Sequence, residues 1–300
     1  MSSHHIARDI TYATAAKGRG GRAVIRTLEN ATGRLSLLRR ARGYQRDLES
    51  GADFWDVMTR RYGLTLEVTS GDLSNIPSRG PLILVANHPF GVLDGLMLGR
   101  ILSMRRGRDF RILAHHVFAK APDLHDVILP ISFDETKDAT RLNVATRVAA
   151  LEYLRKGGAI GVFPGGTVST APRPFGPALD PRWRSFTAKM IARSDATVVP
   201  VYFEGTNSRL FQLASHLHCT LRMSLLIREF KARVDSSVRV VVGDPISNNA
   251  LQRYAKDPIG CMDFLRKATY DLGQDPLNSA RLGHEFEAKY KGRENGSRHF

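Results

Sequence analysis

Apolar and polar positions follow two different patterns along this chain. Short runs that are almost wholly apolar predict buried strands, whereas apolar residues repeated every three or four positions predict helices. Strands that alternate with helices are typical of an α/β fold with a mostly parallel central sheet flanked by helices. The predicted strands are residues 64–68, 82–86, 111–114, 127–131, 159–163, 197–203, 221–229 and 238–242, and the predicted helices are residues 95–104, 143–156, 181–194 and 258–273.

The first fifth of the chain differs, because arginines lie between its apolar positions. Val24, Leu28 and Leu35 fall near helical spacing, and residues 1–62 hold 12 Lys and Arg against 6 Asp and Glu. Basic helices with an apolar stripe bind anionic lipid surfaces. The same pattern also fits a pair of helices that pack on the main domain and expose their arginines to water. Binding to lipid and packing on the domain are compatible with each other.

These patterns divide the chain into three expected parts. Residues 1–62 form a basic N-terminal helical segment for membrane docking, residues 63–275 form the α/β domain, and residues 276–300 form a polar C-terminal tail. Chain ends rich in polar and small residues are poorly ordered unless they are tied down. We therefore expect residues 1–20 to be frayed and residues 289–300 to be disordered.

Composition narrows the class of protein. The chain has 300 residues, of which 42% are hydrophobic and 24% charged, as in folded soluble proteins. Its two cysteines, Cys219 and Cys261, exclude a disulfide scaffold and most cysteine-rich zinc modules, and they suit a reducing compartment. No stretch reaches the ~18 uncharged apolar residues of a spanning helix, and residues 1–10 lack the apolar core of a signal peptide. We expect a cytosolic protein or one peripheral to a membrane.

The formal net charge of +15 predicts a negatively charged partner. Nucleic acid, an anionic membrane surface and an acidic protein or substrate all fit that charge. The sequence has no helix-turn-helix pattern, no aromatic motif of RNA-recognition domains and no zinc finger, so a nucleic-acid partner is not expected and stays a distant alternative. It also lacks the G-x-S-x-G motif of serine hydrolases.

The first candidate site lies in residues 82–94, Leu-Ile-Leu-Val-Ala-Asn-His-Pro-Phe-Gly-Val-Leu-Asp. A buried strand delivers Asn87 and His88 to its carboxyl end, where ligands bind in open α/β sheets. Asp94 can fold back across the Pro-Phe-Gly turn onto one nitrogen of His88, which leaves the other nitrogen to take a proton from a substrate hydroxyl. The alternative is that Asp94 only caps the following helix.

The second candidate site is residues 163–169, Phe-Pro-Gly-Gly-Thr-Val-Ser, at the end of another buried strand. Glycines let the backbone approach a ligand closely, and N–H groups together with the hydroxyls of Thr167 and Ser169 can hold an anion. The glycines fit a simple tight turn equally well. The segment matches neither the P-loop nor the dinucleotide-binding pattern.

These two segments, followed by Val199-Pro200-Val201 on a later strand, resemble the glycerolipid acyltransferase family, which includes lysophosphatidic acid and glycerol-3-phosphate acyltransferases. The resemblance covers residues 64–245, with the motifs in the family's order. It implies transfer of a fatty acyl group from an acyl thioester, acyl-CoA or acyl carrier protein, to a lysolipid hydroxyl, with no cofactor. It also implies a peripheral enzyme at the cytoplasmic face of the inner membrane.

In this resemblance His88 is the general base and Asp94 its orienting partner. The third motif binds the head group of the acceptor. The family's second motif supplies a cation, for which residues 120–141 are the only place and Lys120, Lys137 and Arg141 are the candidates. Residues 203–208, Phe-Glu-Gly-Thr-Asn-Ser, look like a third motif too, but they directly follow Val199–Val201, where the fourth belongs. The implied substrate-binding residues are Asn87, Lys120, Arg141, Phe163, Pro164, Gly165, Gly166, Thr167, Ser169 and Glu204, the last also readable as a surface carboxylate.

Two departures from the family pattern bear on the acceptor. The spacing is His-x5-Asp rather than His-x4-Asp, and Gly165 and Val168 replace the usual Glu and Arg of the third motif. The missing Arg is a cation that would pair with phosphate. Both departures resemble the branch named after hemolysins and the bacterial enzymes that complete ornithine lipids and other aminolipids. A lyso-aminolipid is thus the expected acceptor, with 1-acylglycerol-3-phosphate as the alternative.

A histidine-rich segment raises the question of a metal. His115 and His116 precede Asp123 and His125, but the spacing across a proline-containing loop matches no standard ligand pattern. No metal is expected.

Overall fold

The computed structural model describes residues 11, 13, 18–120, 122–132, 134, 136–275 and 278–287, without the side chains of residues 117, 120 and 219. The segment 289–300, expected to be disordered, lies outside these residues, as does most of 1–17. None of the described helices combines the length and the apolar character needed to cross a membrane.

The described residues form one seven-stranded sheet, in the order β1-β7-β6-β2-β5-β3-β4. Every neighbouring pair is parallel except β6 and β7, which are antiparallel. The mostly parallel sheet confirms the predicted fold class. The strands are β1 (Thr65–Ser70), β2 (Leu82–Ala86), β3 (Phe110–His115), β4 (Ile128–Ile131), β5 (Ala159–Val162), β6 (Thr197–Phe203) and β7 (Ser237–Val242).

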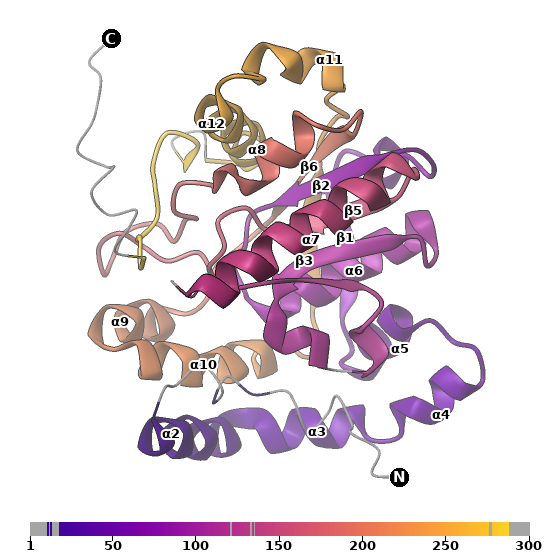
Figure 1. Ribbon diagram of the computed structural model, residues 1–300. Helices are drawn as coiled ribbons and strands as arrows, with labels where there is room; N and C mark the ends of the chain where they lie inside the picture. Colours follow the sequence, from indigo (N-terminus) through magenta and orange to yellow (C-terminus); the bar gives the residue numbers. More distant parts are fainter. Residues whose placement is uncertain are drawn as a thin grey trace.

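Helices cover both faces of this sheet (Figure 1). They are α2 (Arg19–Glu29), α3 (Leu35–Ala41), α4 (Tyr44–Glu49), α5 (Phe54–Arg61), α6 (Val92–Arg106), α7 (Lys137–Arg155), α8 (Ser185–Ile191), α9 (Arg209–Leu217), α10 (Cys219–Lys231), α11 (Asn248–Leu251) and α12 (Pro258–Tyr270). A π-helical turn, η2 (Asn30–Arg34), joins α2 to α3, and short 3-10 turns are η3 (Leu73–Asn75), η4 (His116–Lys120), η5 (Pro122–Leu124) and η6 (Gln252–Tyr254).

Strand β2 lies at the middle of the sheet and is wholly buried. Because side chains alternate along a strand, Leu82 and Leu84 join a core cluster with α5, α6 and α10, whereas Ile83 and Val85 join one with α7, α8 and α12. Its neighbours are β5 and β6, with Val85 in register with Val162 on one side. The carboxyl ends of β2, β5 and β6 therefore lie side by side, and these are the strands that carry the three motifs.

One predicted strand is wrong, because residues 221–229 lie within the helix α10. The segment Leu225-Leu226-Ile227 is a short apolar run, and such a run fits a buried strand and a buried helix equally well. In the structure Leu226, Ile227 and Phe230 are buried at positions i, i+1 and i+4, which is one side of a helix. The helix packs against α2 and α9.

The basic N-terminal segment is helical, as predicted, and it shares the core of the sheet. Leu37, Tyr44 and Trp55 are buried in the same cluster as the side chains of β2 and α6. Arg34 is buried, and Arg40 forms an ion pair with Asp235. The segment is thus packed on the α/β domain, and its role in membrane docking stays a prediction.

Candidate active site

The turn between β2 and α6 brings His88 and Asp94 together. Gly91 has φ 93° and ψ −124°, a backbone conformation that residues other than glycine rarely adopt. The turn made by this glycine lets α6 begin at Val92. Asp94 lies in the first turn of α6, where Oδ2 accepts hydrogen bonds from the backbone N–H groups of Phe90 (2.8 Å) and Gly91 (2.9 Å). The same oxygen lies 2.9 Å from His88 Nδ1. Asp94 therefore both caps the helix and faces the histidine.

Burial dominates the electrostatics of this carboxyl group. Asp94 is completely buried, and this desolvation raises its pKa, while the contacts with His88 and with the two backbone N–H groups act in the opposite direction. A buried carboxylate in contact with imidazole fixes the tautomer that carries its proton on Nδ1. It also stabilises the imidazolium that forms when Nε2 takes up a proton.

The ring of His88 lies against Phe163, the first residue of the third motif. The two rings are stacked, with centroids 4.3 Å apart and planes 23° apart, and the His88 side chain is 18% exposed. Since Nδ1 faces Asp94, Nε2 is the nitrogen left to meet a substrate. This contact also joins the ends of β2 and β5 in one site.

Asp180, which sequence reasoning missed, ties the two motif loops together. It is completely buried, and its Oδ1 accepts from the backbone N–H of His88 (3.1 Å) and from the hydroxyl of Ser169. Its Oδ2 accepts from Trp183 Nε1 (2.8 Å), and the N–H of Ser169 donates to the His88 carbonyl (2.7 Å). The sequence held no signal for this, because Asp180 lies 92 positions from His88 and outside every motif.

The third motif forms the tight turn that was one of its two interpretations. Gly166 has φ 69° and donates its N–H to the Phe163 carbonyl at 3.0 Å, and the Pro164 carbonyl accepts from the N–H of Arg184. A side chain at Gly165 would lie 3.2 Å from the carboxyl group of Asp180. The hydroxyl of Ser169 is bound to Asp180. Binding of an acceptor by this loop stays a prediction.

A second residue missed by the sequence reasoning supplies positive charge to this loop. Arg222, on α10, is buried, and its Nη2 donates to Thr167 Oγ1 at 2.9 Å and to the Val168 carbonyl at 3.0 Å. Its guanidinium lies over the ring of Phe286. The sequence reasoning missed Arg222 because it predicted a strand at 221–229, and a strand there does not predict a contact between Arg222 and the third motif.

The other predicted site residues lie in several places. Asn87 is buried and exchanges two hydrogen bonds with the backbone of Phe203, at 2.9 Å and 2.7 Å, so it joins the ends of β2 and β6. Glu204 accepts from the Thr69 hydroxyl at 2.6 Å and lies 3.3 Å from Arg239, on the side of β1 and β7.

The candidates for the second-motif cation were Lys120, Lys137 and Arg141. Lys137 is exposed at the start of α7, and no described contact brings Lys137 or Arg141 to His88. Arg141 is exposed on α7 and pairs with Asp138 at 3.5 Å, and the side chain of Lys120 lies outside the described residues. Within the described part of the chain, no group of three or more His, Cys, Asp or Glu side chains is placed to hold a metal ion.

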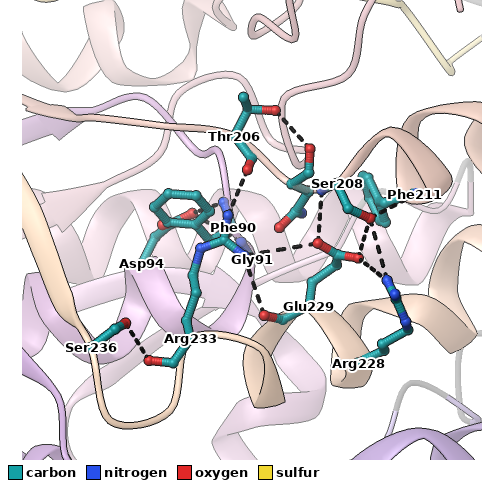
Figure 2. A network of polar contacts seen from close by, with 11 residues as sticks. Phe90, Gly91, Asp94, Thr206, Ser208, Phe211, Arg228, Glu229, Arg233 and Ser236 are labelled. Carbon is teal, nitrogen blue, oxygen red and sulfur yellow. Dashed lines mark hydrogen bonds and ion pairs between the residues drawn. The ribbon is translucent and has the colours of Figure 1, made fainter.

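A polar network joins the loop that follows β6 to Glu229 and Arg233, beside Phe90 and Asp94 (Figure 2). Glu229 accepts from the N–H of Ser208 (2.8 Å) and from its hydroxyl (2.6 Å). Arg233 lies over the ring of Phe90 at 4.0 Å. Burial lowers the pKa of Arg233, while the negative charges of Glu229 and Asp94 act to raise it. Arg233 thus brings a cation to the wall of the site beside Asp94.

Comparison with known proteins finds two curated relatives and one solved structure that are similar to this chain. The chain is 25% identical over 231 residues to a lyso-glycine lipid O-acyltransferase of Phocaeicola vulgatus, covering 74% of this chain and 78% of that protein. It is 24% identical over 231 residues to a lyso-glycine lipid O-acyltransferase of Bacteroides thetaiotaomicron, covering 74% and 80%. A crystal structure of the 1-acyl-sn-glycerophosphate acyltransferase of Thermotoga maritima matches with 16% identity and a TM-score of 0.42, over 84% of this chain and 85% of that one.

A family model described as Acyltransferase matches residues 45–279. This match begins inside the basic N-terminal segment and spans the sheet, the dyad of His88 and Asp94 and the third motif. Since it covers well over half of the chain, the protein belongs to the acyltransferase family and is an acyltransferase, as its motifs predicted.

Proposed function

We propose that the protein transfers a fatty acyl group from an acyl thioester to the hydroxyl of a lysolipid. The observation that carries this proposal is the contact of Asp94 with His88 Nδ1 at the carboxyl end of β2, which leaves Nε2 for the substrate. Nε2 takes the proton of the acceptor hydroxyl as its oxygen attacks the thioester carbonyl. The carbon–sulfur bond then breaks, and the leaving thiolate takes the proton back from His88. Backbone N–H groups near the glycine turn are the candidates for stabilising the oxyanion.

The proposed acceptor is a lyso-aminolipid, such as the precursor of an ornithine lipid. Val168 is buried at the position where the usual third motif of the family it resembles has an arginine, a cation that would pair with phosphate. The cation near this loop, Arg222, is itself buried and bound to Thr167 and Val168. The names of the two curated relatives, both lyso-glycine lipid O-acyltransferases, support the same class.

The proposed donor is an acyl carrier protein or acyl-CoA, and the proposed location is the cytoplasmic face of the inner membrane. Both donors are acidic, as is an anionic leaflet, and the net charge of +15 fits each of them. These assignments rest on charge and on the family resemblance.

An acyl transfer assay with paired acceptors tests the proposal. The purified protein is mixed with a donor that carries a labelled acyl chain, either acyl carrier protein or CoA. The acceptor is either a lyso-aminolipid or 1-acylglycerol-3-phosphate. We expect a diacyl aminolipid and one free thiol for each acyl group transferred, with a higher kcat/KM for the lyso-aminolipid. Preference for 1-acylglycerol-3-phosphate would contradict the proposed acceptor, and failure with every lysolipid would contradict the function.

A further inference from the structure

The helix α9 presents leucines to the outside as well as to the core. Leu210, Leu213 and Leu217 are 50%, 37% and 75% exposed, and their spacing of three and four residues places them on one side of the helix. Phe211 and Ala214 on its other side are buried. A single exposed leucine is ordinary in a soluble protein, but a row of them on one helix marks an interaction surface.

Two further apolar side chains extend this row. Leu221, near the start of α10, is 38% exposed, and Phe175, in the loop after the third motif, is 79% exposed. Arg209 Nη1 donates to the Gly176 carbonyl at 3.3 Å, so the loop with Phe175 is attached to the start of α9. We call these five side chains the apolar rim; they are five of the eleven large apolar side chains that the described residues expose.

The two segments that carry the apolar rim contain basic residues and no acidic ones. Residues 205–228 and residues 163–179 contain no Asp or Glu. Arg173 and Arg209 are exposed beside the rim, and α2, with its exposed Arg22 and Arg26, packs against the same α10 that α9 contacts (Figure 1). Leucine and phenylalanine side chains with arginines at their border match the interface of an anionic bilayer, where apolar side chains enter and cations meet head groups.

The helix with the apolar rim is also joined directly to the candidate active site. Phe211 packs with Val168 of the third motif, and Gln212 Oε1 accepts from the N–H of Ala171 at 2.9 Å. The same loop contains Ser169, whose N–H is bound to the His88 carbonyl. A bilayer in contact with α9 thus lies beside the loop proposed to bind the acceptor.

We propose that the apolar rim on α9 enters an anionic lipid bilayer and holds the active site at its surface. This inference rests on the proposed function, because an acceptor whose chain stays in the bilayer can then bring its hydroxyl to His88. It differs from docking by the N-terminal arginines alone, because the apolar rim supplies the insertion and the arginines only the attraction of charge. A second copy of the chain and an acyl carrier protein are the competing occupants of this surface.

The first test is binding of the full chain to vesicles of phosphatidylglycerol and phosphatidylcholine, measured by sedimentation. The double variant L210Q/L217Q is expected to bind at least tenfold more weakly than the unchanged protein. The matched control is V148Q/I259Q, because Val148 and Ile259 are 51% and 49% exposed on α7 and α12, and it is expected to bind normally. Equal binding of both double variants would overturn the proposal.

A second test measures insertion itself. Leu217→Trp places a fluorophore on the apolar rim, and Val148→Trp places one on α7 as the control; the native Trp55 and Trp183 are buried. Vesicles with brominated acyl chains are expected to quench the added fluorescence of Leu217→Trp and not that of Val148→Trp. Absence of quenching at Leu217 would overturn insertion. Two other results would also overturn the proposal. One is a dimer of the native protein that the variant L210Q/L217Q converts to a monomer. The other is loss of carrier-protein binding by this variant while its vesicle binding stays intact.

Activity separates failure of this inference from failure of the proposed function. L210Q/L217Q is expected to keep transfer to a water-soluble short-chain lysolipid within about twofold and to lose at least tenfold with a vesicle-embedded lysolipid. Equal loss with both acceptors would contradict the membrane role of the rim. Vesicle binding by His88→Ala needs no chemistry, so it tests the rim even if acyl transfer fails.

Discussion

At the scale of single residues, one oxygen atom of Asp94 makes the contacts that cap a helix and also the contact with His88. Oδ2 accepts the N–H groups of Phe90 and Gly91 at the start of α6 and also faces Nδ1 of His88. Asp94 therefore caps the helix and also contacts His88, and the catalytic role of this pair stays a prediction. The extra residue, relative to the usual spacing, is accommodated in the turn where Gly91 takes its positive φ.

Asp94→Asn tests the charge of this residue. The amide keeps the size of the side chain and one oxygen for capping, but it no longer stabilises the imidazolium. We expect kcat for acyl transfer to fall by about 10³- to 10⁴-fold, by the precedent of catalytic triads. Vesicle binding should stay unchanged, which serves as the control. A kcat within tenfold of the native value would show that Asp94 acts only as a helix cap.

At the scale of elements, the strands and most helices could be predicted because their apolar patterns are local. The carboxyl ends of β2 and β5 were found in the same way, since His88, Asp94 and residues 163–169 directly follow buried strands. Asp180 and Arg222 could not be found, because their roles depend on contacts between segments far apart in the sequence. The apolar run at 221–229 was misassigned because its periodicity is compatible with either structure.

Ser169→Ala distinguishes a tether within the loop from a substrate contact. Its hydroxyl is buried and bound to Asp180, and a hydrogen bond to a charged group contributes about 1.5–3 kcal/mol. We expect urea unfolding to show a loss of that size, with the KM for the acceptor changed less than threefold. Ser215→Ala, which removes a bond to the neutral carbonyl of Phe211, is the control and should cost about 1 kcal/mol. Unchanged stability with a tenfold higher KM would assign the hydroxyl to the substrate.

At the scale of the whole molecule, the net charge of +15 has several structural uses. Arg34, Arg106 and Arg266 are buried within the protein, and Arg40 is paired with Asp235. Among the described residues, the arginines exposed on the N-terminal helices and their connections are Arg19, Arg22, Arg26, Arg39, Arg42, Arg46 and Arg60. Composition gives the size of the charge, but only the fold separates these exposed arginines from the structural ones.

Reversing these charges tests their part in membrane binding. Glutamate at Arg22, Arg26 and Arg39 is expected to weaken binding to anionic vesicles, by about 1 kcal/mol for each cation lost from the surface. The difference in vesicle binding between the variant and the native protein should become smaller in high salt, because salt also screens the attraction between the native arginines and the anionic lipids. Arg155→Glu with Lys156→Glu, two exposed cations at the end of α7, is the control. Unchanged sedimentation at low salt would show that the N-terminal helices face away from the membrane.

The most direct test of the whole account is acyl transfer by His88→Ala. His125→Ala is the matched control, because His125 is exposed and also lies beside a carboxylate, Asp126. We expect His88→Ala to lose acyl transfer to a lysolipid by at least 10³-fold while its unfolding transition is retained. His125→Ala should keep full activity. Retention of most of the activity by His88→Ala would contradict the assignment of the dyad as the catalytic centre.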